Sequence, residues 1–242
     1  VSADKKNVYA VNETTPGSVA SFSFNPGTGT LSLLNARSSG GNNPCYLALD
    51  KTGKWLTAGN YGNGTVSLIP VKNDGKLDYP ADVMKHVSIV SADGKSQLEP
   101  HVHCTVFSPD NKYLYVVDLG IDQVITYTLD GVNGRLNVVP PPYFVNTKAG
   151  AGPRHFVFHP SGKFTYLIEE LSGAVSVYSA AKSPYLELVQ NISSHPADYK
   201  GAIASADIHI SPDGKFLYAS NRGESNSLAI FKIDETTGKL TS

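Results

Sequence analysis

Residues 152–178 read GPRHFVFHPSGKFTYLIEELSGAVSVY, and this stretch decides the fold. Three alternating runs (HFVF, FTYLI and AVSVY) are separated by the turn segments HPSGK and LSG, and a further run, LELV, follows at residues 186–189. Strand length, β-branched and aromatic content and turn chemistry agree at each step. The stretch therefore predicts four consecutive antiparallel strands.

The same pattern recurs along the chain. Three further copies and a partial one read PCYLALDKTGKWLTAGNYG (44–62), HVHCTVFSPDNKYLYVVDLG (101–120), ADIHISPDGKFLYASNRG (206–223) and DKKNVYAVNET (4–14). Their equivalent turn residues are Lys5, Gly53, Asn111, Gly162 and Gly214, spaced by 48, 58, 51 and 52. A period near fifty with strand-like content and no capped helical period predicts an all-β chain, a β-propeller with one four-stranded blade per repeat and almost no helix.

The repeats at the two ends are incomplete. The first copy offers strands at 7–11, 18–24 and 30–34 but no first strand, and the last copy stops where its fourth strand would begin, at 239–242. An open ring of blades leaves bare sheet edges. We therefore expect residues 1–242 to form a single propeller domain of about five blades, three of them complete, as a fragment of a longer propeller.

Composition excludes several function classes. The 242 residues are 40% hydrophobic and carry a net charge of −1, so there is no basic field for nucleic acid. No apolar run is long enough to span a membrane. Cys45 and Cys104 are too few for a disulfide framework and are interpreted as buried thiols in a reducing compartment, which predicts a cytoplasmic protein without nucleic-acid or membrane partners.

Two columns of the aligned repeats depart from the small polar or hydrophobic residues that the pattern favours. The first column, where strand one begins, contains Cys45-Tyr46, His103-Cys104, Arg154-His155 and Ala206-Asp207. The second column, where strand two ends, contains Asn12-Glu13, Asn60-Tyr61, Asp118-Leu119, Glu169-Glu170 and Asn221-Arg222. These places share one edge of an antiparallel pair, and strand one is innermost, so both columns should rim one mouth of the central channel.

Four ionisable residues of these columns form the predicted catalytic set: His103, Arg154, Glu170 and Arg222. Two guanidiniums would bind a carboxylate or phosphate and stabilise a developing oxyanion. A histidine can act as acid or base near neutral pH, and Glu170 could orient an arginine or take a proton from water. Further substrate contacts are expected from His101, His155, Asn60, Asp118 and Glu169.

Structural interpretations compete with these assignments. Arg154 and Glu170 could be an ion pair across adjacent strands, without a chemical role. His101 and His103 could be half a metal site, but no third ligand is evident, so neither a metal nor a cofactor is expected.

The remaining histidines have simpler interpretations. His155 and His209 lie near Asp207 in the predicted fold and are expected to hydrogen-bond a carboxylate or the backbone between blades. The others are interpreted as a surface residue in a turn (His159) and as loop residues without a role (His86 and His195).

The sequence resembles the lactonase-type seven-bladed propellers, which include the propeller-type 6-phosphogluconolactonase and the carboxy-cis,cis-muconate lactonizing enzyme. The matching segments are residues 100–124, 150–178 and 206–234, with the combination GPRH, FHP and EL among them. Seven blades in the family imply that about two are absent here. In the muconate branch a histidine, two arginines and a glutamate form the active site, and by motif they fall on His103, Arg154, Arg222 and Glu170.

The resemblance implies a lactone hydrolase, 6-phosphogluconolactonase-like, that opens a small anionic sugar lactone in carbohydrate metabolism. His103 or Glu170 would activate water, and the sequence does not say which. Two alternatives are a carboxymuconate-type lactonizing cyclase and a non-catalytic propeller that serves as a binding scaffold.

Overall fold

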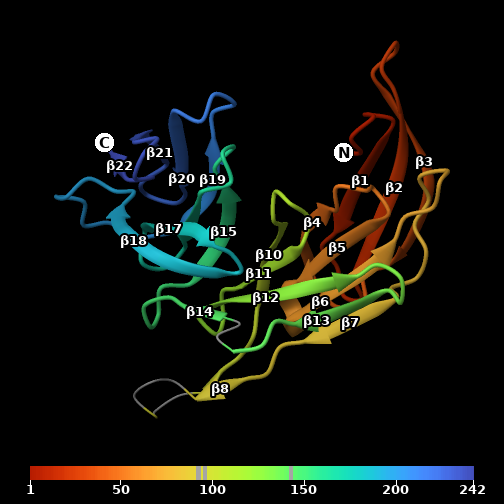
Figure 1. Cartoon of the computed structure of the whole chain (residues 1–242), viewed down its shortest axis with the longest axis horizontal. Helices are drawn as coiled ribbons and strands as arrows, with labels where there is room; N and C mark the ends of the chain where they lie inside the picture. The colour runs from red at the N-terminus through yellow and green to blue at the C-terminus, as the bar shows by residue number, and fades with distance from the viewer. Residues whose placement is uncertain (91–93, 95–96, 142–143) are drawn as a thin grey trace.

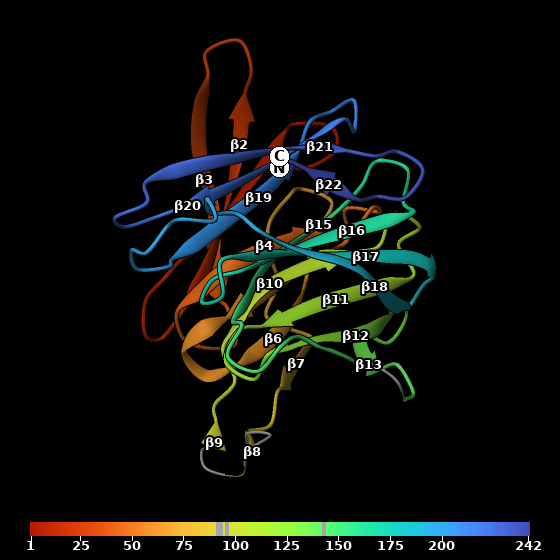
Figure 2. The same cartoon turned by 90° about the vertical axis from the view of Figure 1, so that its left-hand side faces the viewer.

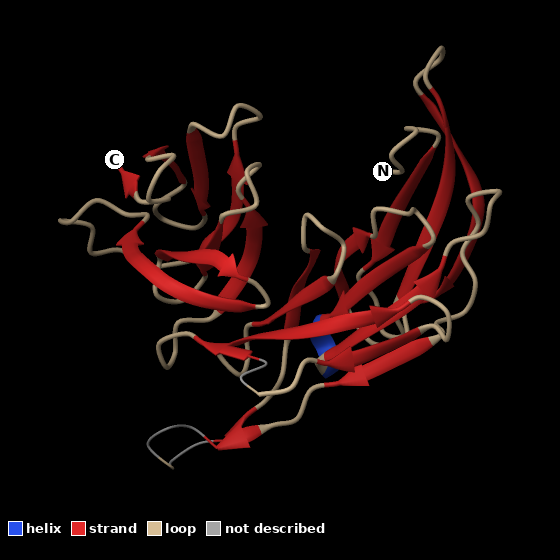
Figure 3. Cartoon of the chain, in the orientation of Figure 1, coloured by secondary structure: helices blue, strands red, loops and turns tan. Residues whose placement is uncertain are grey.

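A computed structural model of the chain describes residues 1–90, 94, 97–141 and 144–242. Figure 1 shows its β-sheets following one another around an arc, with the N-terminal sheet at one end and the C-terminal sheet at the other. Within the described residues a single 3₁₀ turn, η1 (Tyr61–Asn63), interrupts the strands (Figure 3). The prediction of an all-β chain is confirmed.

Five sheets make up the arc. Neighbouring strands in each sheet are antiparallel and lie side by side in chain order, except for the fifth strand of sheet 3. Sheet 1 contains β1 (Asn7–Asn12), β2 (Ser18–Asn25) and β3 (Thr30–Ser38). Sheet 2 contains β4 (Pro44–Leu49), β5 (Trp55–Asn60), β6 (Thr65–Pro70) and β7 (Asp82–Lys85). Sheet 3 contains β10 (Val102–Phe107), β11 (Tyr113–Asp118), β12 (Gln123–Asp130), β13 (Arg135–Val138) and β14 (Phe144–Asn146), which also pairs with β12. Sheet 4 contains β15 (Pro153–Phe158), β16 (Phe164–Glu169), β17 (Ala174–Lys182) and β18 (Tyr185–Ser193). Sheet 5 contains β19 (Ser205–Ile210), β20 (Phe216–Asn221), β21 (Ser227–Ile233) and β22 (Leu240–Thr241).

The turn residue that sets the repeat spacing has a left-handed backbone in all five copies. Its φ is 58° at Lys5, 69° at Gly53, 63° at Asn111, 71° at Gly162 and 77° at Gly214. Glycine and asparagine reach this region most easily because a Cβ crowds the backbone there. In sheets 2 to 5 the repeat is therefore aligned on the position that closes the hairpin between the first and second strands, and Lys5 takes the same position just before β1.

One repeat spacing is longer than the others, and the structure shows why. Between the turns at Gly53 and Asn111 the chain forms an additional two-stranded sheet from β8 (Ile89–Val90) and β9 (Gln97–Leu98). In Figure 2 this hairpin extends below the stacked sheets. The 58-residue interval therefore holds one ordinary repeat and an insertion.

The hydrophobic core is divided among the interfaces between neighbouring sheets. Within the described residues, four clusters of buried side chains each join two consecutive sheets. Representative pairs are Val19 with Leu56 (sheets 1 and 2), Val66 with Val116 (2 and 3), Tyr115 with Phe156 (3 and 4), and Ile168 with Leu217 (4 and 5). Apolar burial between sheets is the main driving force for such stacking, so it fixes how the strand ends meet along the inner side of the arc.

Three histidines expected at the surface or in loops without a role are buried, which corrects those interpretations. His159 is 7% exposed, and its ring contacts the Ser161 hydroxyl at 2.8 Å and the Gly214 carbonyl of sheet 5 at 3.0 Å. The Nδ1 atom of His86, which is 3% exposed, lies 2.6 Å from an Asp118 carboxylate oxygen. His195 is 8% exposed and stacks on Tyr199. The partners of His86 and His159, Asp118 and Gly214, come from another repeat, whereas Tyr199 stacks on His195 from the same loop.

Candidate functional site

Each of sheets 2 to 5 carries a β-bulge near the start of its first strand. In sheet 4, Pro153 pairs with Glu169 and His155 pairs with Ile168, which leaves Arg154 as the extra residue. The same irregularity leaves out Cys45 in sheet 2 and His103 in sheet 3, and it falls between Ser205 and Ile208 in sheet 5. A bulge turns a side chain away from the regular pleat, and β4, β10, β15 and β19 line the inner side of the arc in Figure 1. The bulges therefore set the first predicted column at the inner side of the arc.

The second predicted column separates into two kinds of residue. In sheets 2 to 5 its first members are buried opposite the bulges and hydrogen-bond to the turn or strand that follows, whereas Asn12 of sheet 1 is exposed. The buried members are Asn60, Asp118, Glu169 and Asn221, which are 0%, 0%, 2% and 4% exposed. Of its second members, one residue further on, Glu170 and Arg222 contact each other at the mouth. Three of the predicted substrate contacts (Asn60, Asp118 and Glu169) thus lie inside the sheets, where their hydrogen bonds hold the strand ends.

Asp118 illustrates this structural role, and it carries a testable prediction. Its carboxylate accepts the backbone N–H groups of His101, Gly120 and Ile121 and lies 2.6 Å from His86 Nδ1. Replacing Asp118 by alanine leaves these buried and partly buried donors without an acceptor, so we expect the free energy of unfolding to fall by about 3 kcal/mol or more. Urea denaturation measures this loss, and an unchanged midpoint would contradict the structural role.

The centre of the site is an ion triad that joins sheets 4 and 5. One carboxylate oxygen of Glu170 accepts a hydrogen bond from Arg154 Nε at 2.8 Å and forms an ion pair with Arg222 Nη2 at 3.0 Å. The side chains of Arg154 and Glu170 are 15% and 24% exposed, and that of Arg222 is 48% exposed. Charged hydrogen bonds in such partly shielded surroundings are stronger than those in open water. The structure therefore brings together three members of the predicted catalytic set, and it confirms the Arg154–Glu170 contact between adjacent strands.

Aromatic rings extend this cluster toward sheet 2. His103, 8% exposed, lies 5.1 Å from His155 and 5.8 Å from Tyr61 between ring centroids. His101 stacks on the Tyr61 ring at 4.4 Å, with its Nδ1 at 2.9 Å from the Tyr61 carbonyl. Tyr61 occupies the same column position as Glu170 and Arg222. The alignment of the repeats could therefore have placed Tyr61 in the site, although its side chain is not ionised.

The cluster converges across the inner side of the arc. Tyr46 of sheet 2 meets His155 of sheet 4 at 5.1 Å between ring centroids, although sheet 3 lies between them in the order of the arc. His155 Nδ1 lies 2.7 Å from Asp207 Oδ1, and His209 Nε2 lies 3.0 Å from Asp207 Oδ2. The expected carboxylate contact between sheets is confirmed for His155, whereas His209 meets Asp207 within its own strand, β19.

The protonation states of the cluster limit its chemistry. Burial, with Arg154 and His155 adding to it, lowers the pKa of His103 to about 3, so its ring is neutral at pH 7 and can accept a proton. Burial raises the pKa of the Cys45 thiol to about 12, so this thiol stays protonated and is a poor nucleophile. No group of three His, Cys, Asp or Glu side chains in the described part of the chain is arranged to hold a metal ion. None of the described helices is long and apolar enough to cross a membrane.

Sheets stacked around an axis, with ionisable side chains gathered where their inner strands begin, define an enzyme-like β-propeller site. Comparison with known families agrees: the whole chain, residues 1–242, matches the family described as "Lactonase, 7-bladed beta-propeller". The chain belongs to this lactonase family.

Individual relatives support the same assignment. The chain is 36% identical to a 6-phosphogluconolactonase of Formosa agariphila and 33% identical to one of Bacillus subtilis, and each alignment covers 99% of this chain and 68% of the relative. Among solved structures, the periplasmic gluconolactonase PpgL of Pseudomonas aeruginosa superposes with a TM-score of 0.91 at 34% identity, over 99% of this chain and 68% of that chain.

Proposed function

We propose that this protein is a lactone hydrolase that opens 6-phosphogluconolactone. The observation that carries the proposal is the pair of guanidiniums held on one Glu170 oxygen beside the neutral ring of His103. Relatives named 6-phosphogluconolactonase support the choice of substrate. The site offers what hydrolysis of an ester bond requires: cationic donors for an oxyanion and a group that takes a proton from water.

Arg154 is the proposed oxyanion donor. Its Nε and Nη1 atoms are engaged by Glu170, the Ala206 carbonyl and His155, and no described residue accepts from its Nη2 atom. When water attacks the lactone carbonyl carbon, the carbonyl oxygen gains negative charge that the two Nη2–H donors can stabilise. Arg222, the more exposed of the two, would hold the anionic end of the substrate.

His103 is the proposed general base. It takes a proton from the attacking water and returns it to the ring oxygen when the carbon–oxygen bond of the lactone breaks, so lactone and water give the open-chain hydroxy acid. Burial lowers the pKa of His103 most, and the charges of Arg154 and Arg222 lower it further. Negative charge that develops on the substrate offsets this influence, and the base therefore strengthens as the reaction proceeds.

Glu170 is assigned to orientation in this scheme. Its Oε2 atom already accepts a hydrogen bond from Arg154 and pairs with Arg222, and removing that charge would leave two guanidiniums facing each other without an anion between them. A carboxylate in this position fixes the arginines and is a weaker candidate for taking a proton from water.

The direct test supplies the purified chain with 6-phosphogluconolactone and subtracts the spontaneous hydrolysis. Acceleration above the uncatalysed rate supports the proposal. A chain that instead accelerates only lactonisation of a carboxymuconate would identify a cyclase, and a chain that accelerates neither reaction would overturn the proposal.

A further inference from the structure

The guanidinium of Arg154 is held more firmly than a substrate-binding arginine needs for charge alone. Nε donates to Glu170 at 2.8 Å, and Nη1 donates to the Ala206 carbonyl at 2.9 Å. The second Nη1 hydrogen points to His155 Nε2, 3.3 Å away. These partners come from sheets 4 and 5, so the plane of the guanidinium is fixed from two sides.

The contact to His155 requires one particular tautomer of its ring. Nη1 of Arg154 can only donate, so His155 Nε2 must present its lone pair. The proton then lies on Nδ1, which faces the Asp207 carboxylate at 2.7 Å. Asp207 Oδ1 is itself held by the backbone N–H of Ile208 at 2.9 Å. A chain of oriented groups thus runs from the bulge of β19 through His155 to Arg154.

Burial favours the neutral ring of His155. The His155 side chain is 14% exposed. Burial lowers the pKa of His155 and the adjacent Arg154 lowers it further, while Asp207 raises it. The hydrogen bond from His155 holds the pKa of Asp207 well below its usual range. The other groups that face the ring are His209 on β19, His103 on β10 and Tyr46 on β4. An ionised Asp207 beside a neutral His155 is the arrangement that lets Arg154 donate.

We propose that Asp207 and His155 form a positioning pair that sets the orientation of Arg154, so that its Nη2 donors are directed at the reacting carbonyl. The role of Arg154 on the lactone rests on the proposed function. Neither Asp207 nor His155 needs to touch the substrate. Protonation of His155 would put an N–H on Nε2 opposite the N–H of Nη1, and two donors facing each other would displace the guanidinium.

Two substitutions at one position separate this role from a purely structural one. The shorter amide introduced by His155→Asn would lie near the position of Nδ1, so this variant can keep the bond to Asp207 and loses the acceptor for Arg154. The longer amide of His155→Gln reaches the position of Nε2, so that variant can keep the acceptor and loses the bond to Asp207. We expect His155→Asn to lower kcat about 10- to 100-fold with little change in KM and in thermal stability, and His155→Gln to retain more of the activity than His155→Asn.

Full activity in both variants, or an equal loss of activity in both, would overturn the positioning role. Loss of activity in His155→Gln alone would also overturn it, because it would show that His155 only links sheets 4 and 5 through Asp207. A measurement that does not depend on activity is the ¹⁵N NMR spectrum of the imidazole rings in the unmodified protein at pH 7. The Nδ1–H tautomer at His155, with a pKa that rises in Arg154→Ala, supports the pair. The Nε2–H tautomer would overturn it, even if the protein hydrolyses no lactone and the proposed function itself fails.

Discussion

Replacement of Arg154 by alanine is expected to lower kcat/KM for 6-phosphogluconolactone by about 10²- to 10³-fold, the usual effect of removing one oxyanion donor. The two N–H groups at Nη2 of Arg154 donate to none of the described residues, whereas Nε and Nη1 are held by Glu170, His155 and Ala206. Steady-state kinetics with the spontaneous reaction subtracted measure the loss. Most of it should be in kcat, because the interaction strengthens as charge develops.

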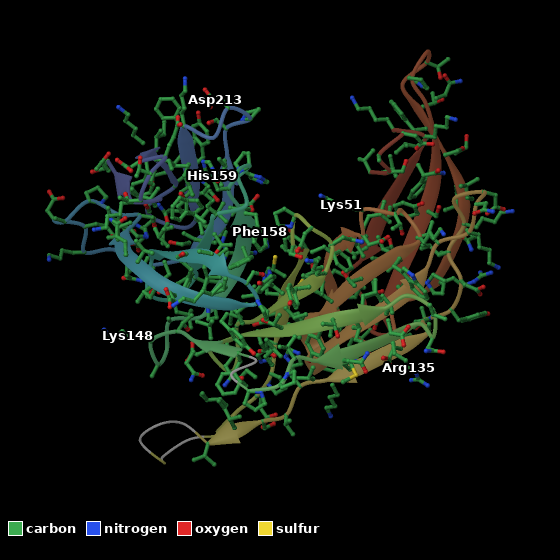
Figure 4. The ribbon with its side chains drawn as sticks, viewed as in Figure 1. Lys51, Arg135, Lys148, Phe158, His159 and Asp213 are labelled. Carbon is green, nitrogen blue, oxygen red and sulfur yellow. The ribbon has the colours of Figure 1, made fainter. Side chains whose placement is uncertain are left out.

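Arg154→Lys provides a sharper version of the same experiment. A single ammonium cannot reach Glu170, the Ala206 carbonyl and a substrate oxygen together, so this variant should lose nearly as much activity although it keeps the charge. Arg135→Ala is the matched control: Arg135 lies on β13 at the outer side of the arc in Figure 4, is 62% exposed and pairs with Asp82. Equal kinetics for Arg154→Lys and the unmodified protein would remove Arg154 from the reaction.

Replacement of His103 by asparagine should lower kcat by about 10²-fold or more, because the general base is lost. Protonation of His103 should also cause no loss of activity in the unmodified protein as the pH falls from 8 to 5. The pKa of His103 is lowered to about 3, so the competent neutral form prevails above that pH and is lost only as the pH falls through it. Pre-steady-state and steady-state rates across this pH range test both statements.

The control for this variant is His159→Asn, another buried histidine, which Figure 4 labels on the ribbon and which contacts Ser161 and Gly214 away from the triad. It should lower the unfolding temperature and leave kcat unchanged. Full activity in His103→Asn would assign the proton transfer to Glu170 instead.

Much of the fold follows from local chemistry that a sequence displays. The turns at Gly162 and Gly214 need a left-handed residue, and alternation of apolar residues marks the strands beside them, so both were predictable. The β8–β9 hairpin was not, because it belongs to no repeat. Burial of His159 was not predictable either, since the Gly214 carbonyl that binds it comes from the next repeat.

The candidate site was predictable as a group and less so residue by residue. Aligned repeats placed Arg154, Glu170 and Arg222 at one mouth, where the structure finds them in contact. They could not say that Glu169 is buried and Glu170 is not, because the buried position of Glu169 depends on hydrogen bonds from the Ser172 and Ser176 hydroxyls of the turn and strand that follow. Tyr61 was overlooked because a tyrosine does not stand out by charge.

The bulges also have a consequence for how such a site can change. Cys45, His103 and Arg154 are each the extra residue of an otherwise regular pairing, so their side chains take no part in matching one strand to its neighbour. A substitution there alters what the mouth presents while the strand pairing beneath it stays in register. Each of these sheets therefore contributes one replaceable position to a shared surface, and selection for a different lactone could act on these positions one sheet at a time without rebuilding the scaffold.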